Sequence, residues 1–116
     1  AQLRLDCAPL AYVQPEMAHT GVSQFVAIST LATARGAGVI PHATIGVGIF
    51  MAASLHAAAT LARCPCHEYQ HSVFDRNLEY VSTTMRCARG AFTLPEGPGL
   101  GIEPSDRLWD FVRNEG

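Results

Sequence analysis

The sequence has no long apolar run, no run of basic residues and no large excess of one charge. Its 116 residues carry 8 basic and 10 acidic side chains, which gives a net charge of -2. A nucleic-acid-binding surface needs clustered Lys and Arg, so we expect no nucleic-acid partner. The most apolar stretch, Ile45–Ala62, contains His56 and many small residues. We expect a buried helix there rather than a membrane span, and no membrane partner.

The sequence also lacks the cysteine spacing of a disulfide scaffold. Cys64 and Cys66 flank one proline and lie too close for an easy mutual bridge, while Cys7 and Cys87 are far away in the chain. A C-P-C segment is not the C-x-x-C pair that is typical of zinc sites. No signal-peptide pattern is present either, so we expect a reduced, cytoplasmic protein.

One segment, His67-Glu68-Tyr69-Gln70-His71, matches the H-E-x-x-H pattern of zinc proteases. In those enzymes the pattern lies in the middle of a helix, so that both histidines face one metal ion. Here Pro65 comes two residues earlier and no amphipathic helical pattern surrounds the motif. On a strand the two imidazoles would lie far apart, because each residue rises about 3.3 Å. We therefore expect neither histidine to bind zinc, and the protease is the weakest alternative.

Short apolar runs alternate with helical patterns in the first part of the chain. The runs predict three strands, at Leu10–Gln14, Val39–Pro41 and Cys66–Gln70. Between them, helical spacing predicts one helix that starts at Ser23, after a turn at Thr20-Gly21, and runs to Arg35, and a second over Ile49–Ala62. This alternation with short links is typical of parallel β/α units, so we predict an α/β fold.

The last part of the chain differs in composition. We predict an extended segment at Cys87–Leu94, a glycine- and proline-rich loop "LPEGPGLGIEP", and a short helix at Leu108–Val112. We therefore divide the chain into residues 1–86, with the β/α units, and residues 87–116, a C-terminal return segment with a terminal helix.

Three polar side chains stand out by their position on the predicted strands. Glu16 follows the first strand, His42 ends the second and Glu68 lies on the third. In parallel β/α barrels the functional side chains gather at the C-terminal ends of the strands. We therefore expect these three side chains to share one pocket. His19 and His71 could border it or merely hydrogen-bond a loop, whereas His56 is expected to be an ordinary helix residue.

Four segments, in order, carry a family resemblance: "YVQPEMAHTGVSQ", "GVIPHATIGVGIFMAASLH", "HEYQHSVFDRN" and "LPEGPGLGIEP". The chain resembles the C-terminal part of the enolase superfamily, in the mandelate racemase/muconate lactonizing enzyme-like branch that includes acid-sugar dehydratases. The resemblance implies the last three strands of a modified (β/α)7β barrel of the TIM type, followed by a C-terminal tail. In this family a separate capping domain completes the active site.

The resemblance also implies roles for the three polar residues. His42 takes the place of the general base, Glu16 of the carboxylate that orients it, and Glu68 of the glutamate that helps to hold the enolate. Two departures concern Glu16: the family has aspartate there, and the turn "HTGVSQ" is one residue short. Counted back from His42, the acid position falls on Pro15, whereas the "QP" motif places it on Glu16.

The resemblance further implies parts that this sequence does not contain. A full barrel needs roughly 250 residues. The family's Mg²⁺ ligands lie on the third to fifth strands, and its lysine motif on the second; this chain has no K-x-K. We therefore expect Mg²⁺ as cofactor with no ligand from this chain, and partners that include the N-terminal part of the barrel, the capping domain and further copies in a homo-oligomer. Alone, the chain is expected to be inactive.

The implied function is removal of the proton α to a carboxylate, most simply in a sugar-acid dehydratase. A racemase or cycloisomerase of the same superfamily is the alternative within this chemistry. A non-catalytic barrel remnant is the alternative outside it.

Overall fold

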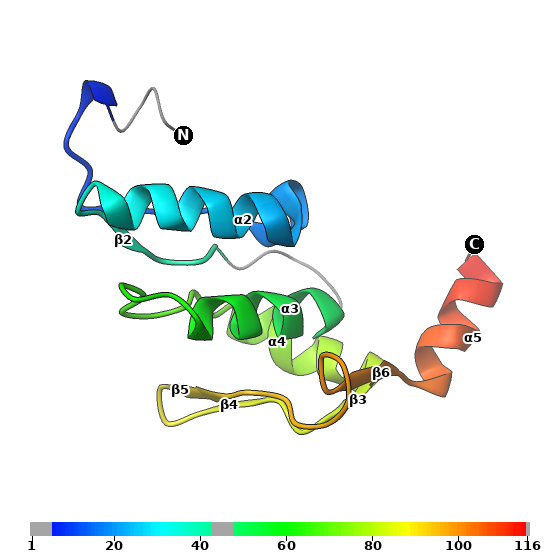
Figure 1. Ribbon diagram of the computed structural model, residues 1–116. Helices are drawn as coiled ribbons and strands as arrows, with labels where there is room; N and C mark the ends of the chain where they lie inside the picture. The colour runs from blue at the N-terminus through cyan, green and yellow to red at the C-terminus, as the bar shows by residue number, and fades with distance from the viewer. Residues whose placement is uncertain (1–5, 43–47, 116) are drawn as a thin grey trace. The chain divides into compact units, whose positions relative to one another are not determined.

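The structure is a computed structural model that describes residues 6–42 and 48–115 (Figure 1). The chain divides into two units, one made of Ala1–Thr44 and Ser54–Tyr69 and the other of Ile45–Ala53 and Gln70–Gly116. Each unit is described by itself. The sequence-based division at residue 87 stays a prediction. Within the described ranges, no helix combines the length and the apolar character that crossing a membrane requires.

Two short parallel strands form the sheet of the first unit. Strand β1 (Tyr12–Val13) pairs with β2 (Gly38–Val39), with Tyr12 opposite Gly38. The amides of Gly38, Ile40 and His42 donate to carbonyls of β1 and its extension at 2.8, 3.0 and 3.0 Å. This even spacing is that of a parallel ladder. The predicted parallel pairing is confirmed, although both strands are shorter than predicted.

The third predicted strand, Cys66–Gln70, is not a strand in the structure, so this prediction is wrong. The segment does follow the free edge of β2, where Val39 N donates to Arg63 O at 2.8 Å and Glu68 N donates to Pro41 O at 3.1 Å. A regular ladder would need N–H groups from Pro41 and Pro65 between these two bonds, and proline has none. In a regular ladder the Pro41 carbonyl would accept from the amide of residue 67. It accepts from Glu68 instead, so the segment contains one extra residue, as in a β-bulge.

Helix α2 (Met17–Ala34) covers the sheet of the first unit (Figure 1). It starts earlier than the predicted helix, but Gly21 interrupts it with φ 70° and ψ 167°. This left-handed φ favours glycine, and the kink lies where the sequence predicts a turn. Below the helix, Ala32, Ala37 and Val39 form a buried cluster against which Val13 and Leu61 pack.

Helix α3 (Gly48–Ala59) agrees with the predicted helix over Ile49–Ala62, except that it ends earlier. The two helices differ in how their buried serines bond: Ser29 in α2 donates to the Phe25 carbonyl at 2.7 Å, four residues earlier, whereas Ser54 in α3 bonds outside its helix. The two glycines of Gly46-Val47-Gly48 also predict a turn before this helix, and that turn lies mostly outside the described residues.

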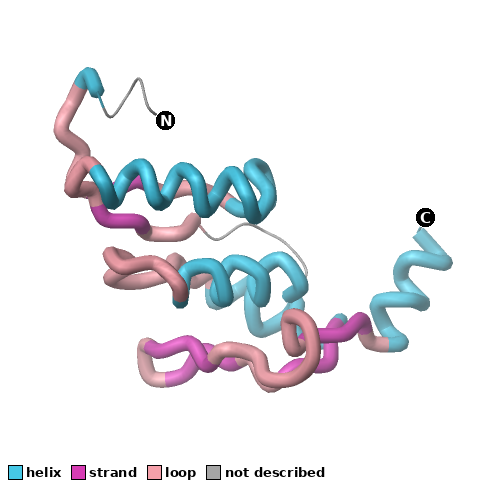
Figure 2. Tube along the Cα trace, viewed as in Figure 1, coloured by secondary structure: helices cyan, strands magenta, loops and turns pink. Residues whose placement is uncertain are grey.

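The second unit contains elements that the sequence pattern did not reveal (Figure 2). Helix α4 (His71–Asn77) continues into a 3₁₀ turn, η1 (Leu78–Tyr80), and strand β3 (Val81–Thr83) pairs antiparallel with β6 (Ile102–Pro104). The Phe74 ring of α4 meets Phe92 edge to face, with ring centroids 5.6 Å apart.

The predicted extended segment Cys87–Leu94 is a hairpin of β4 (Arg86–Ala88) and β5 (Ala91–Thr93). Arg89 and Gly90 form its turn with φ values of 50° and 76°. Positive φ at both central residues gives the turn a twist that suits a tight hairpin.

The predicted terminal helix lies within α5 (Asp106–Glu115), where the Phe111 ring contacts Tyr80 at 6.1 Å between centroids and Arg107 lies over the same Tyr80 ring. Among the described residues, Cys7, Cys64, Cys66 and Cys87 form no disulfide.

Candidate active site

The three residues that the sequence singles out lie together in the first unit. Nδ1 of His42 is 3.0 Å from Oε2 of Glu16, and Nε2 of the same ring is 3.6 Å from Oε2 of Glu68. The ring therefore lies between two carboxylates that come from different segments. The Glu16 side chain is 13% exposed, against 42% for His42 and 35% for Glu68. His42 and Glu68 are thus partly open to solvent, whereas Glu16 is the least exposed of the three.

The parallel register explains why Glu16 meets His42. The His42 amide donates to the Pro15 carbonyl, which continues the β1–β2 ladder and places residue 16 opposite residue 42. Of the two candidate acid positions, Pro15 therefore contacts His42 only through this backbone bond, and Glu16 brings the carboxylate. Glu16 also precedes the first residue of α2, with extended backbone angles of φ −112° and ψ 121°. The longer glutamate side chain reaches the imidazole from there.

Nδ1 of His42 and Oε2 of Glu16 are in contact, but Nδ1 has no hydrogen-bond partner among the described residues. Catalytic hydrogen bonds are often poorly aligned until substrate binds. A second imidazole, His19, approaches the same Oε2 atom of Glu16 at 3.6 Å but is 77% exposed. His19 thus lies beside Glu16 on an exposed part of helix α2, and its role stays a prediction.

A fourth group, which the sequence analysis missed, lies beside Glu68. Nε2 of His67 is 2.8 Å from Oγ of Ser54, and its Nδ1 is 2.8 Å from the Glu68 carbonyl oxygen. Both ring nitrogens face protein groups, and His71 is the first residue of α4, so H-E-x-x-H does not lie within one helix. The signal available in the sequence was Ser54, which with His56 is one of two polar side chains in an apolar helix; the structure shows that Ser54 is fully buried.

Burial lowers the pKa of His67 from its usual 6.5, and the Glu68 carbonyl and charge oppose this only in part. The folded state therefore binds fewer protons than the unfolded state just below pH 6.5, so folding weakens as pH falls through this range. We expect the free energy of unfolding to decrease from pH 7 to pH 5. His67→Leu should remove part of this slope, which denaturant unfolding across pH can measure. An unchanged slope would show that His67 titrates normally.

The described residues contain no group of three or more His, Cys, Asp and Glu side chains that could hold a metal ion. Glu16 and Glu68 instead face the two nitrogens of one imidazole. The residues described here thus do not fit a Mg²⁺ centre by themselves.

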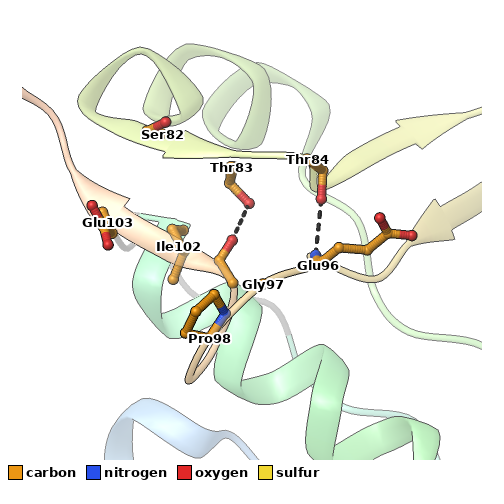
Figure 3. Close-up of a pocket in the computed structure, with 9 residues that line it drawn as sticks. Ser82, Thr83, Thr84, Glu96, Gly97, Pro98, Ile102 and Glu103 are labelled. Carbon is orange, nitrogen blue, oxygen red and sulfur yellow. Dashed lines mark hydrogen bonds between the residues drawn. The ribbon is translucent and has the colours of Figure 1, made fainter.

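The second unit has a separate hollow of about 300 Å³, which none of the predicted site residues line (Figure 3). Thr83 Oγ1 donates to the Gly101 carbonyl at 3.0 Å, and Thr84 Oγ1 accepts from the Glu96 amide at 2.9 Å. These bonds hold the loop "LPEGPGLGIEP", one of the four segments that carry the family resemblance, at Glu96 and Gly101. In the described structure, these two hydrogen bonds anchor the loop beside β3.

Comparison with known proteins identifies the family of the chain. A family model described as "Enolase C-terminal domain-like" matches residues 5–108. The chain therefore belongs to the enolase C-terminal domain-like family, and the sequence-based resemblance to the enolase superfamily is confirmed.

Individual relatives lie in the same superfamily. D-galactarolactone cycloisomerase from Agrobacterium fabrum is 29% identical over 119 residues, which cover 92% of this chain and 31% of the relative. A solved member of the enolase superfamily from Agrobacterium tumefaciens is 46% identical with a TM-score of 0.90, over 93% of this chain and 28% of its own. A Sinorhizobium meliloti protein is 50% identical with a TM-score of 0.88, over 92% of this chain and 29% of its own.

These relatives establish the α/β fold of the enolase C-terminal domain for this chain. The chain spans less than a third of the length of each relative. The number of barrel strands that it contributes stays a prediction.

Proposed function

We propose that this chain supplies the proton-transfer side of an enolase-superfamily active site that acts on a sugar acid. The observation that carries the proposal is the His42 imidazole between the carboxylates of Glu16 and Glu68, at the C-terminal ends of parallel segments. Histidine suits general-base catalysis because its ordinary pKa lies near working pH. The chemistry is removal of the proton on the carbon next to a carboxylate.

In this proposal His42 takes the α-proton at Nε2, the nitrogen that faces Glu68 rather than the less exposed Glu16. The C–H electron pair moves into a carbon–carbon double bond and the substrate carboxylate becomes an enediolate. Glu16 at Nδ1 keeps the proton of the neutral ring on that nitrogen, so that Nε2 can accept. It then stabilises the imidazolium that forms, as the carboxylate does in a serine-protease triad.

Glu68 lies on the Nε2 side of the His42 ring, where the substrate would bind in this proposal. Its Oε2 atom lies 3.6 Å from Nε2, beyond normal hydrogen-bond length, which leaves His42 able to turn to a substrate. In its protonated form Glu68 would donate a hydrogen bond to an enediolate oxygen. Enzymes of this superfamily use Mg²⁺ to stabilise the enediolate. We propose that segments outside this chain hold that ion.

Two outcomes share this first step. In a dehydratase, which the sequence pattern suggests, the enediolate expels the β-hydroxyl, and His42 returns the proton to the departing oxygen as water leaves. In a cycloisomerase, a ring oxygen leaves instead and stays part of the same molecule, so that the product is an isomer. The similarity to D-galactarolactone cycloisomerase favours the second outcome. We propose sugar acids and their lactones as the substrate class for both.

The test uses the full-length protein that carries this sequence, with Mg²⁺ and a panel of aldonic acids, aldaric acids and their lactones. Proton NMR in D₂O should show a substrate whose α-proton exchanges or is lost in turnover. Mass spectrometry then distinguishes loss of water, for a dehydratase, from unchanged mass, for a cycloisomerase or racemase. Lack of exchange with every member of the panel would refute the proposal and favour a non-catalytic barrel remnant.

A further inference from the structure

The pair of Ser54 and His67 forms a hydrogen-bonded chain with a defined direction. The Glu68 carbonyl can only accept, so Nδ1 of His67, 2.8 Å away, must carry a proton. A neutral ring then leaves Nε2 as an acceptor, and the Ser54 hydroxyl, 2.8 Å away, donates to it. Desolvation of this ring, which lowers the pKa of His67, keeps it neutral near pH 7. The chain runs from Ser54 through His67 to the backbone of Glu68.

This chain fixes a segment that the sheet holds poorly. Glu68 lies beyond the bulge, and Pro41 and Pro65 remove the ladder bonds that a regular third strand would make. Its peptide is held on one side by the bond from Glu68 N to Pro41 O, at 3.1 Å. On the other side its carbonyl accepts from His67. The side-chain bond thus takes over part of the role of a missing strand.

Ser54 gives the ring a rigid support. It is fully buried, and it lies in helix α3 rather than on the irregular segment. Because its side chain is inaccessible, Ser54 cannot act on a substrate, although serine and histidine at this distance resemble a nucleophile and its base. Its hydroxyl is instead placed to hold the imidazole in one orientation.

We infer that Ser54 and His67 are positioning residues that hold the Glu68 carboxylate at its place beside Nε2 of His42. This inference rests on the proposed function, since it assigns a role within the same site. A group misplaced by about 1 Å can cost about 10²-fold in rate. The pair therefore acts on turnover through Glu68, without touching the substrate.

The activity test compares two variants of the full-length protein. His67→Leu removes both hydrogen bonds, and kcat should fall by about 10- to 100-fold with little change in KM. His67→Asn keeps an amide N–H near the place of Nδ1, and should recover most of that loss. Wild-type kcat in His67→Leu would overturn the inference, and so would equal losses in two variants that are both folded by circular dichroism.

A second measurement does not depend on activity. Nitrogen-15 NMR of the wild-type protein should show His67 as the Nδ1–H tautomer near pH 7, and Ser54→Ala should change the shift of its Nε2. The Nε2–H tautomer would overturn the inference even if no variant folds. If the wild-type protein exchanges no α-proton, the proposed function fails while this spectrum still tests the hydrogen-bonded chain. If exchange occurs and His67→Leu turns over like wild type, only the inference fails.

Discussion

Replacing His42 with Asn in the full-length protein should reduce kcat by at least about 10²–10⁴-fold, the usual contribution of a general acid–base group. Asparagine keeps a hydrogen-bonding group near Nδ1, within reach of Glu16, but it has no titratable nitrogen in place of Nε2. The ring is 42% exposed, so its removal leaves no large buried cavity. The fold should therefore survive, as circular dichroism and the urea midpoint can verify.

Exchange of the substrate α-proton with solvent deuterium should disappear in His42→Asn as well. A matched control is His56→Asn, which makes the same chemical change in α3 at a residue outside the proposed site. It should keep wild-type kcat. Wild-type turnover and exchange in His42→Asn would make His42 a structural residue only.

Replacing Glu16 with Gln should also cause a large loss, of about 10⁴-fold in kcat if the effect follows that of the orienting carboxylate in a serine-protease triad. Glutamine has nearly the same size, but its amide can donate a hydrogen bond to Nδ1. The ring would then carry its proton on Nε2, and that nitrogen could no longer accept the substrate proton. The imidazolium would also lose its counter-charge, which at present lies 3.0 Å from Nδ1.

Glu16→Asp restores the charge with a side chain one methylene shorter, which is the family's usual residue. Glu16→Asp should recover part of the kcat that Glu16→Gln loses. The recovered fraction measures how strongly the site depends on the longer glutamate side chain at residue 16. Glu115→Gln, at the exposed end of α5, serves as the charge-matched control. Equal kcat values for Glu16→Gln and wild type would remove Glu16 from the proposed mechanism.

The sequence predicts the first two strands and the helices α2 and α3 because their signals are local. The strand at β1, the turn that became the kink at Gly21 and the apolar helix α3 each follow from residues that are near neighbours in the chain. The proximity of Glu16 and His42 follows from parallel pairing alone, since both lie just after their strands. Their roles, and that of Glu68, stay predictions.

The missed features depend on residues that are distant in the chain. Strand β3 finds its partner β6 about twenty residues later, and three-residue strands have too few positions to show an alternating pattern. The wrong prediction of a third strand could be avoided only if the pairing register were known. The register shows that Pro41 and Pro65 fall at positions where a ladder requires N–H donors. The bond between Ser54 and His67 joins a helix to a loop, and no spacing rule connects the two.

The two prolines also give the two halves of the site unequal local stability. On one edge of β2, amides at positions 38, 40 and 42 are closed by a continuous ladder, which holds His42 to the segment of Glu16. On the other edge, the amides of Val39 and Glu68 bond across the seam within the described residues, and the two prolines between these bonds cannot donate. Local opening follows the weakest set of hydrogen bonds. We therefore expect partial unfolding to separate Glu68 from His42 before it separates His42 from Glu16, and the bonds of Ser54 and His67 to oppose that opening.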